Sequence, residues 1–252
     1  MDLGIREKVV LVTGGGRGLG RVDALRFAKE GCRVAVCDID LKGAEKVAQE
    51  IADSGGGAIP LKCDISKADQ INEVLEKITS TWKSVDILVN NAAVLDNIAP
   101  IDKMKDNLWL RDIEINLTGT YYMTRACFLP MKAQKWGRIV TMSSVAGALG
   151  GFGQASYSAT KGGVISLMKT VALEGGRFNV TANSIVGGII RTEAYSGIDP
   201  KMGERIERRT VFGRPASMEE IADAIVFLCS ENASYITGVE LVVAGGINLF
   251  TF

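Results

Sequence analysis

The sequence of 252 residues contains no histidine, and this absence excludes several kinds of active site. No histidine can activate a serine or cysteine nucleophile, and no zinc or iron site can have an imidazole ligand. We expect no metal site. Any proton transfer must therefore use a tyrosine, lysine, serine or carboxylate side chain.

Cysteine is scarce, and the chain has no net charge. The five cysteines include no close pair with metal-ligand spacing, so we interpret them as buried, reduced thiols. Lys and Arg together number 29 and balance 29 Asp and Glu, which argues against nucleic acid or an anionic membrane as a partner. The segment Met1 to Lys8 is charged and resembles neither a signal peptide nor a membrane span, so we expect a cytoplasmic protein.

Hydrophobic residues make up 47% of the chain, which is enough to bury a large core. Strand-length apolar stretches rich in Val and Ile alternate with stretches of helical period, a pattern typical of a parallel sheet covered on both faces. We predict one α/β domain over residues 1–252, a doubly wound seven-stranded parallel sheet with a Rossmann fold. The expected strands are Val9–Thr13, Arg33–Asp38, Ala58–Lys62, Asp86–Asn90, Arg138–Met142, Asn179–Val186 and Glu240–Val243. The expected helices are Leu19–Glu30, Leu41–Ser54, Lys67–Trp82, Lys105–Gln134, Ala155–Glu174 and Met218–Ser230.

The stretch 189–213 has no strong hydrophobic period and carries many charged side chains. We interpret it as a substrate lid within the domain, containing one or two short helices. A solvated surface helix is an alternative of equal weight.

A glycine-rich turn, Thr13 to Gly20, follows the first expected strand and opens the first helix. Its glycines allow the backbone to approach a pyrophosphate at the helix N-terminus. Asp38, at the end of the second strand, is suited to bind the adenosine ribose and to repel a 2′-phosphate, which favours NAD over NADP. Arg17 could instead serve a 2′-phosphate, but a carboxylate at contact distance from that dianion would be repulsive.

Tyr157 and Lys161 lie four residues apart in a predicted helix and so share one helix face. An ammonium group stabilises a neighbouring phenolate and lowers the phenol pKa from its unperturbed value of about 10. We therefore expect Tyr157 to exchange a proton with an alcohol or ketone while hydride moves to or from a nicotinamide. The alternative is a tyrosine and a lysine that are merely neighbours on an exposed helix.

Two more residues support the catalytic interpretation. Ser144, at the end of the fifth expected strand, is suited to hydrogen-bond the substrate oxygen. Asn116 is a polar residue beside an apolar stripe in the long predicted helix. It could hold water or anchor the lysine through its backbone carbonyl, or it could be a core amide with satisfied hydrogen bonds.

Taken together, these motifs resemble the short-chain dehydrogenase/reductase family over nearly the whole chain. The resemblance rests on Thr13 to Gly20, Asp64, Asn90-Asn91-Ala92-Ala93, Asn116, Ser144, Tyr157 with Lys161, and Gly188 to Thr192. Ala93, Gly187 and Ala244 depart from the family pattern, where glycine, proline and aspartate are usual.

The resemblance implies a catalytic tetrad of Asn116, Ser144, Tyr157 and Lys161. It also implies that Asp64 and Ile65 flank the adenine, that Lys161 binds the nicotinamide ribose, and that the protein is a homotetramer. The residues expected to bind NAD are Gly14, Arg17, Gly18, Leu19, Gly20, Asp38, Ile39, Asp64, Ile65, Asn91, Tyr157, Lys161, Gly188, Ile190 and Thr192.

The loops expected to line the substrate cavity are mostly apolar and carry no basic cluster. They contribute Val94, Leu95, Val145–Leu149, Phe152, Gln154 and Tyr195. We predict an NAD(H)-dependent oxidoreductase that interconverts a mostly apolar secondary alcohol and the corresponding ketone. This small molecule is the expected partner.

Two alternative functions stay open. An NADPH-dependent 3-oxoacyl-[acyl-carrier-protein] reductase would need a basic landing patch, for which the candidates are Lys132, Lys135, Arg138 and Arg177. A non-catalytic dinucleotide sensor is disfavoured by the intact set of Ser144, Tyr157 and Lys161.

Overall fold

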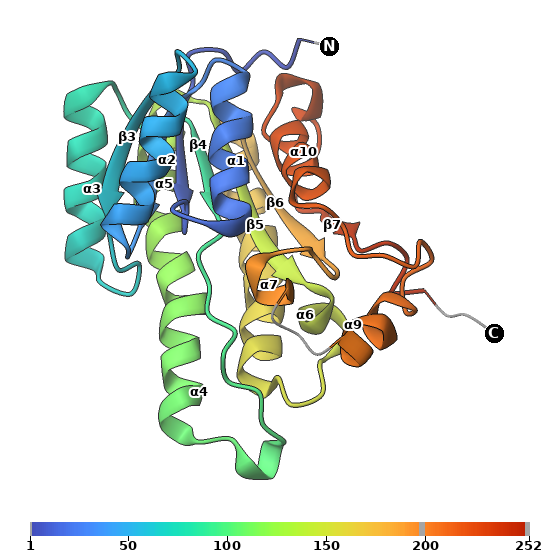
Figure 1. The fold of residues 1–252 in the computed structure, drawn as a ribbon. Coiled ribbons are helices and arrows are strands. Elements are labelled where there is room, and N and C mark those ends of the chain that lie inside the picture. The colour runs from blue at the N-terminus through green and yellow to red at the C-terminus, as the bar shows by residue number, and fades with distance from the viewer. Residues whose placement is uncertain (1, 197–199, 250–252) are drawn as a thin grey trace.

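The computed structural model describes residues 2–196 and 200–249, and within them seven strands form one parallel sheet (Figure 1). The strand order is β3-β2-β1-β4-β5-β6-β7, and every neighbouring pair is parallel. The predicted α/β fold with a doubly wound parallel sheet is confirmed. The strands are β1 Val9–Thr13, β2 Arg33–Asp38, β3 Gly57–Lys62, β4 Ile87–Asn90, β5 Gly137–Ser144, β6 Val180–Gly187 and β7 Glu240–Val243.

Helices follow most of the strands and lie on both faces of the sheet, as Figure 1 shows. Their ends agree with the predicted ends to within two residues for five of the six predicted helices. The helices are α1 Gly18–Lys29, α2 Leu41–Asp53, α3 Ala68–Thr81, α4 Asp106–Asp112, α5 Thr120–Gln134, α6 Val145–Leu149, α7 Ala155–Gly175, α8 Glu193–Ser196, α9 Pro200–Glu207 and α10 Met218–Leu228.

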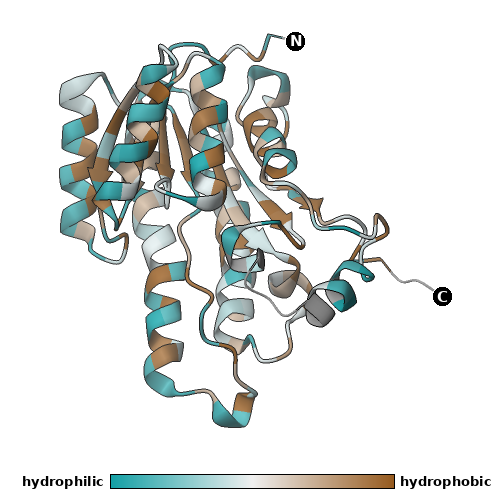
Figure 2. Cartoon of the chain, viewed as in Figure 1, coloured by the Kyte–Doolittle hydropathy of each residue, from teal (hydrophilic) through white to brown (hydrophobic). Residues whose placement is uncertain are grey.

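Two hydrophobic cores, one on each face of the sheet, arise from the alternation of side chains along the strands. In β1, Val10 and Val12 face one core, whereas Val9 and Leu11 face the other. Helices α1, α2 and α10 cover the first core, and α3, α5 and α7 cover the second. Figure 2 shows the hydrophobic strands between helices whose outer surfaces are largely hydrophilic. Because both faces are covered, the central strands have apolar residues at consecutive positions.

The direction of winding reverses between β1 and β4, and this reversal positions the functional site. The chain runs outward from β1 to β3 and then returns to β4 on the other side of β1. Ligands bind in the crevice outside the carboxyl ends of the strands at such a reversal. Thr13 ends β1 and Asn90 ends β4, so the loops that begin at Gly14 and Asn91 border this crevice.

The long helix expected over 105–134 is interrupted in the structure. Between α4 and α5, Ile113–Gly119 is a π-helical segment, in which hydrogen bonds skip one more residue than in an α-helix. Asn116 lies in this segment and is buried. The extra residue per turn rotates the side chains that follow, a change that hydrophobic periodicity alone does not reveal.

The stretch 189–213 contains the two short helices α8 and α9, and residues 197–199 lie outside the described part of the chain. The helix α6, directly after β5, was not predicted; it is a single turn capped by Ser144. Among the described residues, the structure has no helix long and apolar enough to cross a membrane.

Candidate active site

A cavity of about 530 Å³ lies at the carboxyl ends of β1, β2, β3 and β4. The sequence predicted most of its walls as a cofactor site. The predicted lining residues are Gly14, Arg17, Gly18, Asp38, Ile39, Asp64, Ile65, Asn91 and Thr192; the cavity also contacts Cys37, Cys63, Ala92, Ala93, Val94, Ile115 and Glu193.

The glycine-rich turn leaves the N-terminus of α1 open toward this cavity. Gly14 and Gly18 have φ values of +64° and +54°, the left-handed region that favours glycine. A Cβ atom placed on Gly18 would meet no atom within 4 Å, so this side of the turn borders open space. Helix α1 has no side-chain N-cap and no acidic residue in its first turn. Its backbone N–H groups and positive dipole end therefore suit a pyrophosphate, as a dinucleotide would supply.

Asp38 connects the glycine-rich turn with the end of β2. Its Oδ2 atom accepts a hydrogen bond of 2.9 Å from the Gly16 backbone, and its Oδ1 atom accepts one of 2.9 Å from Asp40. A carboxylate offers about four acceptor positions, so two remain available for a ribose. The structure thus places a carboxylate in the wall of this cavity.

Asn91 fixes the opposite wall by bonding to the glycine-rich turn. Its side-chain Nδ2 donates to the carbonyl oxygens of Thr13 and Gly14, at 3.1 and 3.2 Å. The Thr13 hydroxyl accepts hydrogen bonds from the backbone of Asn91 and Ala92. The ends of β1 and β4 are therefore joined by side chains beneath the cavity, and Asn91 lines it.

A second cavity, of about 270 Å³, shares Asn91, Ala93, Val94 and Thr192 with the first and continues it toward β5 and α7. It brings together predicted residues from distant parts of the chain. Those residues are Leu19, Ser144, Tyr157, Lys161, Gly188 and Ile190, joined by Leu95, Met142, Ser143 and Gly187. Gly20, by contrast, packs against the Gly14 carbonyl, where a Cβ atom would come within 2.1 Å.

Lys161 is held inside the protein by the end of β5. Its Nζ atom donates a hydrogen bond of 2.6 Å to the Met142 carbonyl, and its own carbonyl accepts one of 2.8 Å from the Ser143 hydroxyl. Burial lowers the pKa of Lys161 from 10.5 to about 8. The Nζ atom lies 5.6 Å from the centre of the Tyr157 ring.

The phenol of Tyr157 is hydrogen-bonded by Ser144, and the two effects on its pKa oppose one another. Burial raises the pKa above 10, and the hydrogen bond with Ser144 lowers it. The predicted lowering of this pKa by Lys161 is wrong for the protein as the structure describes it. The desolvation of the phenolate exceeds the opposing effect, and the ammonium group is directed to Met142.

Asn116 is buried and its side chain is fully engaged with the loop after β4. Its Oδ1 atom accepts a hydrogen bond of 2.8 Å from the Val94 backbone N–H, and its Nδ2 atom donates one of 2.9 Å to the Val94 carbonyl. Its backbone carbonyl accepts from the Thr120 hydroxyl rather than from Lys161. Asn116 thus positions Val94 in the wall between the two cavities.

The predicted apolar walls are present only in part. Val94 and Leu95 line the second cavity, but Leu149 and Phe152 are 63% and 93% exposed and are absent from its lining. The hydroxyl of Tyr195 donates to Glu207 within the 189–213 stretch. Ile115 and Glu193 line the first cavity and were not predicted as site residues. Glu193 lies in the 189–213 stretch that was interpreted as a lid, whereas Ile115 belongs to no local motif.

The four basic residues considered as a landing patch lie at the wrong end of the sheet. Lys132 and Lys135 precede the start of β5, and Arg177 precedes the start of β6, whereas Ser144 ends β5. Arg138 has no exposed surface and donates to Glu231. None of these side chains lines the cavity that contains Tyr157.

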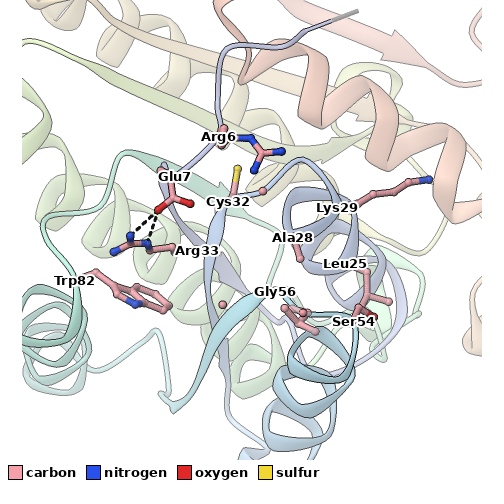
Figure 3. A pocket seen from close by; sticks show the side chains of 14 residues that line it. Arg6, Glu7, Leu25, Ala28, Lys29, Cys32, Arg33, Ser54, Gly56 and Trp82 are labelled. Atoms are coloured by element: carbon pink, nitrogen blue, oxygen red, sulfur yellow. Dashed lines mark hydrogen bonds and ion pairs between the residues drawn. The ribbon is translucent and has the colours of Figure 1, made fainter.

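A larger cavity, of about 640 Å³, lies at the opposite, amino-terminal edge of the strands (Figure 3). The last turns of α1 and α2 border it, together with Trp82, and Arg33 in its wall is paired with Glu7. The C-terminal carbonyls of the two helices disfavour an anion there. The chemistry is expected in the paired cavities at the carboxyl edge.

The glycine-rich turn lies where the winding reverses, and the cavity beside it contains a serine, a tyrosine and a lysine. This combination defines a nicotinamide-dependent oxidoreductase of the short-chain type. The comparisons agree. The protein-family model described as enoyl-(acyl carrier protein) reductase matches residues 14–248. The chain belongs to the short-chain dehydrogenase/reductase family.

Known proteins resemble the chain over its full length. The 3-oxoacyl-[acyl-carrier-protein] reductase FabG of Aquifex aeolicus is 37% identical, covering 98% of this chain and 100% of that protein. The (3R)-3-hydroxyacyl-CoA dehydrogenase of Canis lupus familiaris is 33% identical, covering 97% of this chain and 98% of that protein. A crystal structure from Agrobacterium tumefaciens, assigned provisionally as a gluconate dehydrogenase, has a TM-score of 0.96 and 27% identity, with both chains covered completely.

Proposed function

We propose that this protein is a reductase of 3-oxoacyl substrates, which it interconverts with the corresponding 3-hydroxyacyl compounds. The observation that carries the proposal is the phenol of Tyr157, bonded by Ser144 beside Lys161, in a cavity continuous with the nucleotide cavity. Support for the acyl substrate comes from the relatives, since the Aquifex and Canis proteins are both named for 3-oxoacyl or 3-hydroxyacyl chemistry.

The chain's own residues supply the proton and hold the substrate oxygen. In the reducing direction, Tyr157 gives its phenolic proton to the carbonyl oxygen, and Ser144 donates a hydrogen bond to the same oxygen. The bound nicotinamide cofactor supplies the hydride. Lys161 holds the end of β5 beside Ser144 through its hydrogen bond to Met142, and its Nζ atom lies 5.6 Å from the centre of the Tyr157 ring. Asn116 keeps Val94 in place, so that the wall beside the reacting carbon stays formed.

We further propose that the coenzyme is NAD(H). Asp38 supports this choice, because its carboxylate faces the cavity and is held by Gly16 and Asp40. A 2′-phosphate would carry nearly two negative charges toward this carboxylate, and among the described residues that line the cavity only Arg17 has a compensating positive charge. The proposal thus differs from the NADPH-dependent alternative in the coenzyme and agrees with it in the substrate.

A second candidate is a dehydrogenase of mostly apolar secondary alcohols that lack an acyl carrier. The apolar lining of the second cavity favours it, with Val94, Leu95, Met142 and Ile190 around the reacting group. None of the four basic residues considered as a landing patch lies beside that cavity, and this also favours the second candidate.

A steady-state assay separates the candidates. The purified protein is tested with NADH and NADPH against acetoacetyl-CoA and a panel of apolar cyclic and aliphatic ketones. The proposal expects a higher kcat/KM for acetoacetyl-CoA with NADH, and turnover of ketones alone would reject it. Tyr157→Phe should lower kcat about 10²- to 10⁴-fold, the range for a lost general acid, and retain coenzyme binding. A non-catalytic sensor would show no turnover in either form.

We also propose that the protein forms a homotetramer. Strand β7 is an edge of the described sheet, and Val242 is exposed on it. Two further apolar side chains in the C-terminal half, Leu173 and Tyr235, are 87% and 102% exposed. Unpaired edges and exposed apolar side chains are typical of subunit contacts. Light scattering coupled to size-exclusion chromatography tests this directly, and a mass of a single chain of 26.9 kDa would reject it.

A further inference from the structure

A buried carboxylate, that of Asp112, lies between the helix with Asn116 and the helix with Tyr157. Asp112 ends α4, and its side chain is 2% exposed. A buried carboxylate is costly unless hydrogen bonds replace its water. Its Oδ2 atom accepts a bond of 2.6 Å from the Ser156 hydroxyl, and its Oδ1 atom accepts bonds of 3.2 and 2.8 Å from the Nε and Nη2 atoms of Arg111. Both carboxylate oxygens are therefore engaged.

The bond to Ser156 reaches the residue next to the proposed acid. Ser156 is fully buried and stands in the first turn of α7, directly before Tyr157. Helix α7 has no side-chain N-cap and no acidic residue in that turn. Asp112 provides from another helix the negative charge that a helix N-terminus favours.

The other end of the network reaches the loop after β4. Arg111 donates to both carboxylate oxygens of Asp96 as well as to Asp112. Asp96 follows Val94 by two residues, and Val94 is held by Asn116, one helical turn after Asp112. The network Asp96–Arg111–Asp112–Ser156 therefore ties the loop, the Asn116 helix and the Tyr157 helix to one another.

We propose that Asp112 and Ser156 are positioning residues that set the phenol of Tyr157 against Ser144. The proposal rests on the proposed function, in which Tyr157 is the proton donor. The hydroxyl of Ser156, one residue before Tyr157, is bonded to Asp112 and so constrains the first turn of α7. Without this bond the end of the helix would fray. Loss of that constraint lets the phenol move away from Ser144, whose hydrogen bond stabilises the phenolate. Of the charged residues on α4 and α7, Lys161 lines the same cavity as Tyr157, Asp112 and Arg111 form an ion pair that Asp96 joins, and Asp106, Lys169 and Glu174 do not line that cavity.

The test uses the full-length protein with Ser156→Ala, Asp112→Asn and Ser156→Thr. The matched control is Ser166→Ala, an exposed serine on the same helix. The hydroxyacyl substrate is oxidised over a range of pH. We expect Ser156→Ala and Asp112→Asn to lower kcat about 10- to 100-fold, with KM for the coenzyme within about twofold of wild type. The apparent pKa of the kcat profile should move upward, and Ser156→Thr should restore both values.

A purely structural role predicts a different pattern. If Ser156→Ala and Asp112→Asn lower only the melting temperature and keep kcat and the pH profile of the control, the proposal is wrong. Should both of these variants fail to fold, Asp112→Glu decides: it keeps the charge but moves the acceptor of the Ser156 hydrogen bond, so a displaced pH profile supports positioning and an unchanged one rejects it.

A separate measurement distinguishes this failure from failure of the proposed function. If wild type shows no turnover, the proposed function fails. Hydrogen exchange measured by mass spectrometry then still tests whether the hydrogen bond between Ser156 and Asp112 restrains the first turn of α7. Faster exchange of the backbone amides of residues 155–160 in Ser156→Ala than in Ser166→Ala supports this restraint, and equal exchange rejects it.

Discussion

The Nζ atom of Lys161 donates a hydrogen bond of 2.6 Å to the backbone carbonyl of Met142. This bond joins helix α7 to the end of β5 directly beside Ser144, and it orients a lysine that is buried and whose pKa is lowered to about 8. Ser144, Tyr157 and Lys161 thus depend on one another through the junction of a strand and a helix.

Replacing Lys161 should separate stability from activity. Folding lowers the lysine pKa from 10.5 to about 8, so below pH 8 the folded protein carries a desolvated ammonium group. At 1.36 kcal/mol per pKa unit, this disfavours folding by about 3 kcal/mol, a cost that fades between pH 8 and 10.5. Lys161→Met is expected to raise the unfolding free energy at pH 7 by about 1 to 3 kcal/mol and to lose turnover. Urea unfolding at pH 7 and pH 10 measures this.

The control for that experiment is Lys169→Met, on the same helix, where the lysine is half exposed and pairs with Glu240. An exposed pair contributes between about 0 and 1 kcal/mol, so its replacement should change stability little. Equal destabilisation by both variants would contradict the assignment of a desolvation cost to Lys161.

Removing the hydroxyl of Ser144 should shift the pH dependence of the reaction. The hydrogen bond from Ser144 lowers the pKa of Tyr157, and burial raises it. In Ser144→Ala the raising effect acts alone, so the apparent pKa for alcohol oxidation should increase and kcat should fall about 10²-fold. Ser144→Thr keeps a hydroxyl and should restore part of both. A kcat profile of Ser144→Ala that overlies the wild-type profile would show that the hydroxyl does not act on the phenol.

Two substitutions at Asp38 separate its charge from its hydrogen bonds. Asp38→Asn keeps an acceptor oxygen for Gly16 and removes the negative charge, whereas Asp38→Ala removes both. We expect Asp38→Asn to raise kcat/KM with NADPH about 10-fold relative to NADH, because repulsion of the 2′-phosphate is lost. Asp38→Ala should in addition raise KM for both coenzymes. An unchanged coenzyme ratio in Asp38→Asn would assign the preference to other residues.

Asp23 is a buried carboxyl whose two oxygens have no hydrogen-bond partner among the described residues. It lies in α1, and burial raises its pKa well above 3.8. The folded protein therefore keeps this proton where the unfolded chain loses it, so stability falls as pH rises from 3.8 toward the raised pKa. Asp23→Asn should flatten this dependence, and Asp23→Val should raise the unfolding free energy at pH 7 by about 1 to 3 kcal/mol. Denaturation at pH 5 and pH 8 measures both, and a wild type with equal stability at the two values would contradict the prediction.

The amino-acid sequence alone determined the alternation of strands and helices and hence the fold. It did so because buried parallel strands and amphipathic helices have different hydrophobic periods, and each is visible within about ten residues. The glycine-rich turn, Asp38 and the spacing of Tyr157 and Lys161 were likewise recognisable, since each motif is local and its chemistry depends on residue type. The interruption of the helix at Asn116 was not recognisable, because a π-helical segment changes hydrogen bonding without changing composition.

Only the tertiary structure decided how those residues interact. The pKa of Tyr157 depends on how deeply the phenol is buried and on where the Lys161 ammonium group points, and both result from the packing of α7 on β5. The partner of Asn116 is a backbone group 22 residues away, and the partner of Ser156 is a carboxylate 44 residues away. Hydrogen bonds and desolvation act through space, so contacts between distant segments cannot be read from local pattern.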